Sequence, residues 1–228
     1  MSPETYLSKS GINPAELPSD FIDQVSHYQQ QLRAAVSMAE IAPQWQYQVP
    51  ELGEGGSCSL FGQLAAEPYD LEKTLGGKTP ANIRLLQQVT SVVQFYRQHS
   101  RSQWFGVYQT RINPQGETVL VKLAYFGAAS RAEFPLTPEF AAISNNSTVG
   151  MTGKGRIINN VESYVAAGGE YYTCDPKVQA EACLPLLAKD GRVLGIIDAE
   201  AFEQHIFSGA ELALLIAVAV SLQVYLEE

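Results

Sequence analysis

The chain has 228 residues, 46% of them hydrophobic, which suits one large domain or one domain with an extension. Its net charge of −9, spread along the chain, argues against a nucleic-acid-binding surface, which needs a basic patch. Three cysteines without a CxxC pair argue against a disulfide framework and a structural zinc site, and indicate a reducing compartment.

No segment near the N-terminus has the apolar stretch of a signal peptide, and the most apolar run, residues 212–226, is too short to span a bilayer comfortably. We therefore expect a cytoplasmic protein without a membrane partner. No motif for a cofactor or a metal ion is evident, so none is predicted.

The first part of the chain is irregular in pattern. Residues 1–18 are polar and contain three prolines, which predicts a lead-in without regular structure. Ser19-Asp20 can cap a helix with apolar residues at helical spacing, and this helix should end before Pro43. Residues 43–80 are rich in glycine and proline and are expected to be irregular as well.

A clear helix follows. Thr79 can cap it, Pro80 suits its first turn, and its apolar stripe continues to about His99, which we expect to interact with the dipole at the helix end. We therefore predict an N-terminal extension, residues 1–78, and a main domain, residues 79–228.

After this helix the pattern becomes that of strands. Trp104–Tyr108 and Thr118–Phe126 form a predicted hairpin with a turn at Asn113–Gly116. Residues 127–155 are rich in loops, and Arg156–Val161 is a third predicted strand.

The C-terminal part predicts a second hairpin and a helix. Glu181–Ala188 and Arg192–Glu200 are strands joined by Asp190-Gly191, a strong signal for a two-residue loop. Ser208 and Glu211 have the spacing of a capping box for an apolar final helix. That helix must be covered by the sheet and the first helix of the main domain, or by a second subunit. The element order predicts an α+β fold, with an antiparallel sheet, helices on one face and loops on the other.

The second hairpin predicts a cluster of acids. With a two-residue loop, Glu181 lies opposite Glu200 and Cys183 opposite Asp198, and all four side chains point to one face. Carboxylates this close in a half-buried pocket share a proton, so at least one pKa is raised and that acid can deliver a proton near neutral pH. Alternatively, the acids simply face water, and a one-residue shift in the turn would break the alignment.

Two further features favour a site. Cys174 follows Tyr171-Tyr172 on a predicted loop, which favours an accessible thiol, although an inert cysteine is the alternative. Trp104 and Tyr108 each lie two residues from Gly106 on one predicted strand, so their side chains share a face. Ordinary sheet packing would explain the two aromatic residues too.

These residues carry a resemblance to a known family. From about residue 80 onward the chain resembles a GAF domain and, within that superfamily, the free methionine-(R)-sulfoxide reductases. The matching segments are Cys174-Asp175, Glu181, Leu184-Pro185-Leu186, Gly195-Ile196-Ile197-Asp198-Ala199-Glu200 and Trp104-Phe105-Gly106-Val107-Tyr108.

The resemblance implies a GAF-like fold and a role for each residue. Cys174 would be the nucleophile that attacks the sulfoxide sulfur. The three acids, Glu181, Asp198 and Glu200, would bind the substrate's ammonium group and protonate the departing oxygen, with Asp198 as a catalytic residue. A sulfoxide oxygen is a poor leaving group until it is protonated, which agrees with such an arrangement.

The same resemblance implies an aromatic wall around the methyl-sulfur group, formed by Trp104 and Tyr108. The chain departs from the family in lacking its further cysteines, which reduce the oxidised nucleophile. Cys183, on the predicted pocket face, and Cys58 are the candidate replacements.

Three functions remain open at this point. The first is reduction of free L-methionine-(R)-sulfoxide, with the oxidised cysteine recycled by a dithiol such as a thioredoxin-like reductant. The second is a non-catalytic GAF sensor that binds a small molecule in the same pocket. The third is a dimerising module, because the apolar final helix and the helical extension favour a homodimer.

Overall fold

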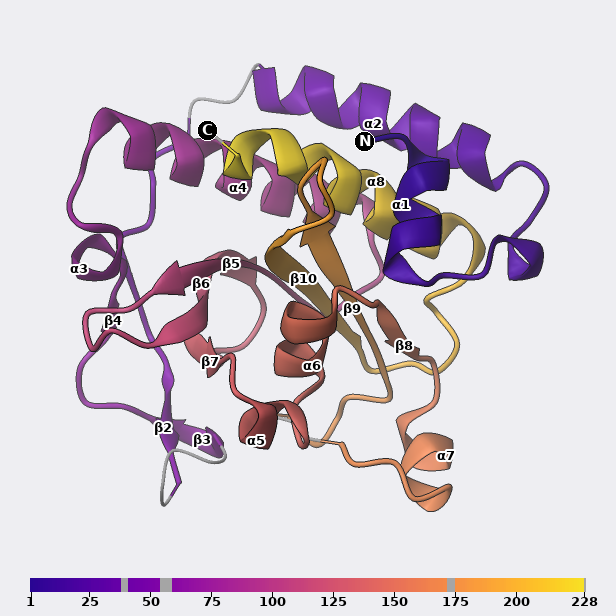
Figure 1. Cartoon of the computed structure of the whole chain (residues 1–228). Coiled ribbons are helices and arrows are strands. Elements are labelled where there is room, and N and C mark those ends of the chain that lie inside the picture. The colour runs from indigo at the N-terminus through magenta and orange to yellow at the C-terminus, as the bar shows by residue number, and fades with distance from the viewer. Residues whose placement is uncertain (38–40, 54–58, 172–174, 228) are drawn as a thin grey trace.

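The computed structural model describes residues 1–37, 41–53, 59–171 and 175–227 (Figure 1). A six-stranded antiparallel sheet with the order β7-β6-β5-β10-β9-β8 lies at its centre. Its strands are β5 (Trp104–Ile112), β6 (Thr118–Phe126), β7 (Glu133–Pro135), β8 (Arg156–Ile158), β9 (Ala180–Leu187) and β10 (Val193–Ala201). The predicted α+β class and the antiparallel sheet are confirmed.

The long helices gather on one face of this sheet, and the loops with the short helices between β7 and β9 lie on the other (Figure 1). The long helices are α2 (Phe21–Ser37), α4 (Pro80–His99) and α8 (Gly209–Leu226). The remaining helices are α1 (Pro3–Ser10), η1 (Pro14–Glu16), α3 (Leu71–Leu75), α5 (Pro138–Ala141), α6 (Asn145–Thr152) and α7 (Val161–Ala166). Two small ribbons pair β1 (Gln46–Tyr47) with β4 (Tyr69–Asp70) and β2 (Pro50–Leu52) with β3 (Ser59–Leu64).

The helix α4 has the predicted bounds. The Thr79 side chain accepts a hydrogen bond from the backbone N–H of Asn82, and Pro80 occupies the first turn, where its missing N–H costs nothing. At the other end His99 stacks on Phe95, with 4.2 Å between ring centroids, and its Nδ1 lies 2.9 Å from the Phe95 carbonyl oxygen. The helix therefore follows directly from its local sequence.

The first 78 residues are more regular than predicted. Residues 3–10 form α1, which is capped by the Ser2 side chain and ends at Gly11 in the left-handed conformation with a φ of 76°. Sequence reasoning missed this helix because only Tyr6 and Leu7 among its apolar positions are buried, too few for a periodic stripe. The segment 43–80, expected to be irregular, contains four short strands and a helix.

The extension shares the core of the main domain. The Tyr6 hydroxyl donates to the carbonyl of Pro185 in β9 at 2.8 Å, and the Tyr47 hydroxyl donates to the carbonyl of Lys122 in β6 at 2.7 Å. Leu32 of α2 is fully buried in the same apolar cluster as the residues on the helix-facing side of the sheet. The two parts are thus packed together, and the boundary at residue 79 stays a prediction.

The capping box predicted for α8 is wrong. The Ser208 side chain makes no cap hydrogen bond and instead donates to the carbonyl of His205 at 3.4 Å. Glu211 turns away from its own helix and accepts hydrogen bonds from the Ser100 hydroxyl and from the Arg101 N–H, the latter at 3.2 Å. Glu211 therefore fixes the turn between α4 and β5, because a tertiary partner competes successfully with the local cap.

The helix α8 is apolar on nearly all sides and is covered within the chain. It contacts α2 and α4 on one side and β9 and β10 on the other. By length and composition it could cross a membrane, but 67% of it is buried in this structure, as expected for a core helix. Its apolar surface therefore does not require a second subunit, and the homodimer remains an untested prediction.

The hairpin of β9 and β10 has the predicted register but not the predicted turn. The Ala188 N–H donates to the carbonyl of Arg192, so the loop has three residues, 189–191, and Gly191 adopts a φ of 94°. A bulge at Leu194 then restores the alignment, because the pairing shifts between Val193 and Gly195. The extra loop residue and the bulge offset each other, so the expected pairs, such as Glu181 with Glu200, form farther along the strands.

The third predicted strand is shorter than expected. The strand β8 ends at Ile158, and Val161 begins the short helix α7 instead. Asn160 caps this helix by accepting a hydrogen bond from the Ser163 N–H at 2.8 Å. An asparagine at a helix N-terminus is the local signal that the strand pattern concealed.

Candidate functional site

Three carboxylates lie together on the loop face of the sheet. Glu200 pairs with Glu181 across β9 and β10, and Asp198 pairs with Cys183. On the other side of β10, Glu200 pairs with Trp104 of β5. Glu181 and Asp198 are each 3% exposed, so the alternative in which the acids simply face water does not describe these two.

Two asparagines at the start of α6 hold the buried acids. The Asn145 side-chain amide donates to Glu181 Oε1 at 2.9 Å, and the Asn146 amide donates to Asp198 Oδ2 at 3.1 Å. Sequence reasoning missed both residues, because α6 is too polar to show a stripe. The available signal was Ser144, which caps α6 and places the two amides in its first turn.

Some acceptor atoms in this pocket lack a donor. Asp198 Oδ1 and Asn145 Oδ1 are buried and make no hydrogen bond within the residues that the structure describes. Buried polar atoms are almost always paired with protein, water or ligand. Two unsatisfied acceptors beside three acids therefore indicate a place for a molecule that donates hydrogen bonds.

Burial and mutual repulsion raise the pKa values of the three acids. For Asp198, burial is the main cause and the charges of Glu181 and Glu200 add to it, so its pKa lies well above the ordinary value. Burial also raises the pKa of Glu181, against the opposing effects of Tyr171, Asn145 and Arg156.

Glu200 has a pKa of about 8, raised by burial first and then by the charges of Glu181 and Asp175. The nearby ammonium of Lys122 opposes this rise. The shared proton expected from the sequence is therefore supported, since at neutral pH the three acids do not all ionise.

Lys122 is a fully buried cation next to the acids. Its Nζ donates to the Ser130 carbonyl at 2.8 Å and to the Ser130 hydroxyl at 2.6 Å. It also lies over the ring of Tyr125, 4.0 Å from the centroid, and over Tyr47 of the extension at 4.9 Å. The hydrophobic pattern of β6 gave no sign of a lysine inside the protein.

Trp104 and Tyr108 form an aromatic wall beside the acids, with ring centroids 6.5 Å apart. The Trp104 indole N–H donates to the carbonyl of Ala128 at 3.1 Å, and the Tyr108 hydroxyl donates to that of Arg131 at 3.1 Å. Gly106 lies between them: a Cβ there would be 2.5 Å from Trp104 Cη2 and 3.1 Å from Tyr108 Cε2. The wall therefore depends on the absence of a side chain at residue 106.

Of the three cysteines, Cys183 lies within the described residues. Cys183 shares the face of Asp198, as predicted, but it is fully buried among apolar side chains that include Tyr108 and Ile196. Burial, and then the charge of Asp198, raises the pKa of its thiol well above the ordinary value. Cys174 and Cys58 lie outside the described residues. No group of three potential metal ligands occurs in the described part of the chain.

The carboxylates enclose a cavity of about 20 Å³, enough for roughly one water molecule. Trp104, Ser130 and Glu200 line it together with the two buried acids, Asn145 and Asn146. The same three residues also line a neighbouring cavity of about 380 Å³. The carboxylate pocket therefore adjoins a much larger space.

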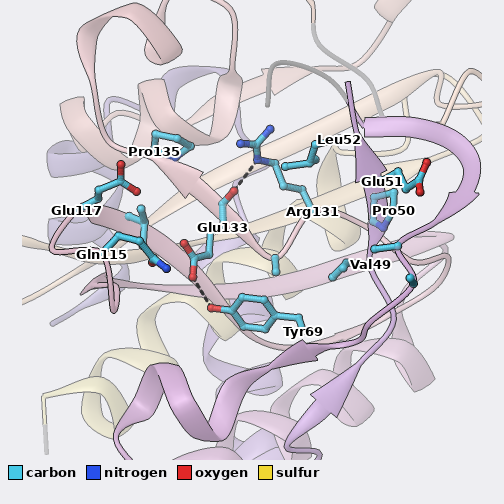
Figure 2. Close-up of a pocket in the computed structure, with 14 residues that line it drawn as sticks. Val49, Pro50, Glu51, Leu52, Tyr69, Gln115, Glu117, Arg131, Glu133 and Pro135 are labelled. Atoms are coloured by element: carbon cyan, nitrogen blue, oxygen red, sulfur yellow. Dashed lines mark hydrogen bonds between the residues drawn. The ribbon is translucent and has the colours of Figure 1, made fainter. Parts of the chain in front are cut away.

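A larger cavity, of about 790 Å³, lies away from the acids, between the β2–β3 hairpin and the sheet edge at β7 (Figure 2). Its central polar groups bond within the protein: Glu133 accepts from the Tyr69 hydroxyl, and the Glu133 carbonyl accepts from Arg131 Nε at 2.6 Å. We therefore place the candidate site at the carboxylates and not at this cavity.

Comparison with known proteins agrees with this fold. The family model of the GAF domain matches residues 83–226. The chain belongs to the GAF domain family. No curated protein matches the sequence. The match lies within the predicted main domain and includes every described site residue named above from β5 to β10.

Solved GAF structures resemble the chain at low sequence identity. A type II free methionine-R-sulfoxide reductase from Thermoplasma acidophilum has a TM-score of 0.54 at 19% identity, covering 64% of this chain and 95% of that one. A protein from Burkholderia vietnamiensis assigned as a GAF sensor has a TM-score of 0.54 at 14% identity, covering 91% and 99%. The free methionine-R-sulfoxide reductase from Neisseria meningitidis, solved with its substrate, has 0.51 at 17%, covering 63% and 78%. These likenesses show the fold alone.

Proposed function

We propose that the protein reduces free L-methionine-(R)-sulfoxide in the carboxylate pocket, with Cys174 as the nucleophile. The observation that carries the proposal is the set of three acids around unsatisfied acceptors, beside an aromatic wall. An ammonium group supplies the missing hydrogen-bond donors and a positive charge that stabilises Glu181 and Glu200 in their ionised forms. The aromatic faces suit a sulfur centre that gains positive character during the reaction.

The reduction proceeds in two steps. The Cys174 thiol attacks the sulfoxide sulfur and forms an S–S bond, while the oxygen leaves as water with the thiol proton and a proton from Asp198, so that a thiosulfonium results. Water then attacks the Cys174 sulfur and the S–S bond breaks, which releases methionine, leaves Cys174 as a sulfenic acid and returns the proton to Asp198. Asp198, whose pKa is raised by burial and by its acidic neighbours, donates the proton that the sulfoxide oxygen needs. Two thiols of a dithiol reductant then reduce the sulfenic acid, giving a disulfide and water.

The recycling step distinguishes the two remaining cysteines. Cys183 is fully buried and its pKa is raised, and both features disfavour a thiolate that could attack a sulfenic acid. A resolving role for Cys183 thus requires the hairpin to open, whereas direct reduction by a thioredoxin-like protein does not. Cys58 remains the alternative named from the sequence.

One assay tests the proposal. Purified protein is mixed with L-methionine-(R)-sulfoxide and dithiothreitol, and methionine is measured. We expect turnover by the wild type and by Cys183→Ala, and at least a thousandfold loss in Cys174→Ser, because no other group supplies the nucleophile. Wild-type protein without turnover, or Cys174→Ser with undiminished turnover, would refute the mechanism.

A non-catalytic sensor is the second candidate. The resemblance to the Burkholderia vietnamiensis protein, which covers 91% of this chain and includes the extension, favours it. A sensor would bind the ligand without consuming it, so calorimetry would give saturable binding of methionine sulfoxide that Cys174→Ser leaves unchanged, and the assay above would detect no methionine.

A further inference from the structure

The cavity next to the carboxylate pocket has an apolar lining. It lies between the sheet and the hairpin of β2 and β3, and we refer to it as the arm cavity and to this hairpin as the arm. Leu64 of the arm, Ala129, Phe202 and the edge of Trp104 line it. Leu64 is 54% exposed and borders this cavity, which has a volume of about 380 Å³.

The two cavities meet at a charged junction. Trp104, Ser130 and Glu200 line both of them, so the arm cavity adjoins the acids at these three side chains. Asp175 also lines the arm cavity and its charge acts on Glu200. The charges of Lys122 and Arg156 compensate the acids only in part, because the pKa values of Glu200 and Glu181 stay raised despite them. The junction therefore attracts positive charge.

The volume and the polar atoms of the carboxylate pocket limit which chemical group it can bind. The carboxylate pocket, at about 20 Å³, accommodates only a small polar group. Asn145 Oδ1, and Asp198 Oδ1 when that acid is ionised, require that this group donate hydrogen bonds. An anionic group is excluded by the three acids, and a purely apolar molecule would leave the two oxygens without a donor.

We propose that the carboxylate pocket and the arm cavity form one binding site for an amphiphilic primary amine. Its ammonium group lies among the acids, and its apolar body extends past Trp104 and Glu200 under Leu64. The arm, which belongs to the N-terminal extension, thereby adds an apolar wall to the site. The proposal shares the carboxylate pocket with the proposed reductase activity but does not depend on the chemistry of Cys174.

The arm offers a matched pair of leucines for a test. Leu64 borders the arm cavity, and Leu52, on the paired strand, borders the separate large cavity of Figure 2. Both are largely exposed, at 54% and 44%, so replacement by serine costs little stability at either position. Only Leu64→Ser removes apolar surface from the proposed site.

The experiment measures binding of ethyl-, butyl- and hexylammonium by calorimetry at pH 8.5, with hexanol and hexanoate as controls. We expect the wild-type affinity to rise roughly fourfold per added methylene, because each is transferred from water to an apolar cavity. Leu64→Ser should weaken hexylammonium binding roughly fivefold while ethylammonium binding stays the same. Leu52→Ser should match the wild type with all three amines.

Several outcomes would overturn the proposal. They are an affinity independent of chain length, equal effects of Leu64→Ser and Leu52→Ser, or hexanol binding as tightly as hexylammonium. Cys174→Ser should bind the amines like the wild type, so a failed reductase assay and a failed binding assay remain separate results. Tight binding of hexanoate would contradict the assignment of the carboxylates as the cation site.

Discussion

The two faces of β10 bury side chains of opposite character. Ile197, Ala199 and Ala201 point to the helices and are fully buried in the main apolar core. Asp198 and Glu200 alternate with these residues along the strand, point to the loops and lie beside other acids. The helix face is stabilised by packing alone, whereas the loop face keeps acids that repel one another, at the expense of stability. A strand can thus combine a core and a site because its side chains alternate.

The largest loss of stability is expected when a carboxylate is added on the helix face of β10, one residue from Asp198. Ala199→Asp places a carboxylate among the helices, where no polar group is available, and we expect a loss of about 4 kcal/mol or more in the free energy of unfolding. The protein should then fail to give a cooperative thermal transition by circular dichroism. Ala128→Asp, on the exposed surface, adds the same charge and should unfold like the wild type.

A smaller effect is expected on the loop face from Gly106→Ala. The new Cβ would overlap Trp104 Cη2, so one ring must move, which costs about 1–3 kcal/mol and lowers the melting temperature by about 2–4 °C per kcal/mol. The double variant Gly106→Ala/Trp104→Leu should recover part of the loss in a double-mutant cycle. Additive losses would mean that the ring does not cause the strain.

Removing a charge from the loop face should stabilise the ligand-free protein. The pKa of Asp198 is raised in the folded state, so the unfolded chain loses this proton first and stability falls as pH rises above about 4. Asp198→Asn should therefore gain about 1–2 kcal/mol at pH 8 and little at pH 4, measured by urea unfolding. Glu203→Gln, which changes an exposed acid, should stay within about 0.5 kcal/mol of the wild type.

The smallest expected effect is the pH dependence of ligand binding. Glu200 has a pKa of about 8, and an ammonium group binds its ionised form, so binding of butylammonium should strengthen roughly tenfold between pH 7 and pH 9. Glu200→Gln should remove most of this rise, as measured by calorimetry. An unchanged pH profile in the variant would assign the titration to another acid.

Local sequence explains the helix face and part of the loop face. The assumed loop aligned Glu181 with Glu200 correctly, although the turn was predicted with one residue too few. The alignment survived because the bulge at Leu194 compensates for the longer loop, and no local pattern predicts such a compensation. Trp104 and Tyr108 share the pocket face as expected, since strand parity determines it.

The partners of the acids could not be predicted, for a physical reason. Asn145 and Asn146 come from a polar helix, and Lys122 from a strand whose neighbours are apolar. Their positions depend on tertiary packing and not on local periodicity. The capping box at Ser208 and Glu211 failed for the same reason, because Glu211 bonds to a turn more than a hundred residues away in sequence.

Tyr47 of the extension contacts Lys122 of the main domain twice: its hydroxyl donates to the Lys122 carbonyl, and its ring lies over the Lys122 ammonium. These contacts bear on where the domain ends. The segment that matches the GAF model, residues 83–226, is the unit that recurs among proteins. The unit that shields the buried cation is larger, because removing the extension would open one wall of its aromatic enclosure to water. In this chain the segment that matches the family model is therefore smaller than the packed structure that encloses the buried lysine.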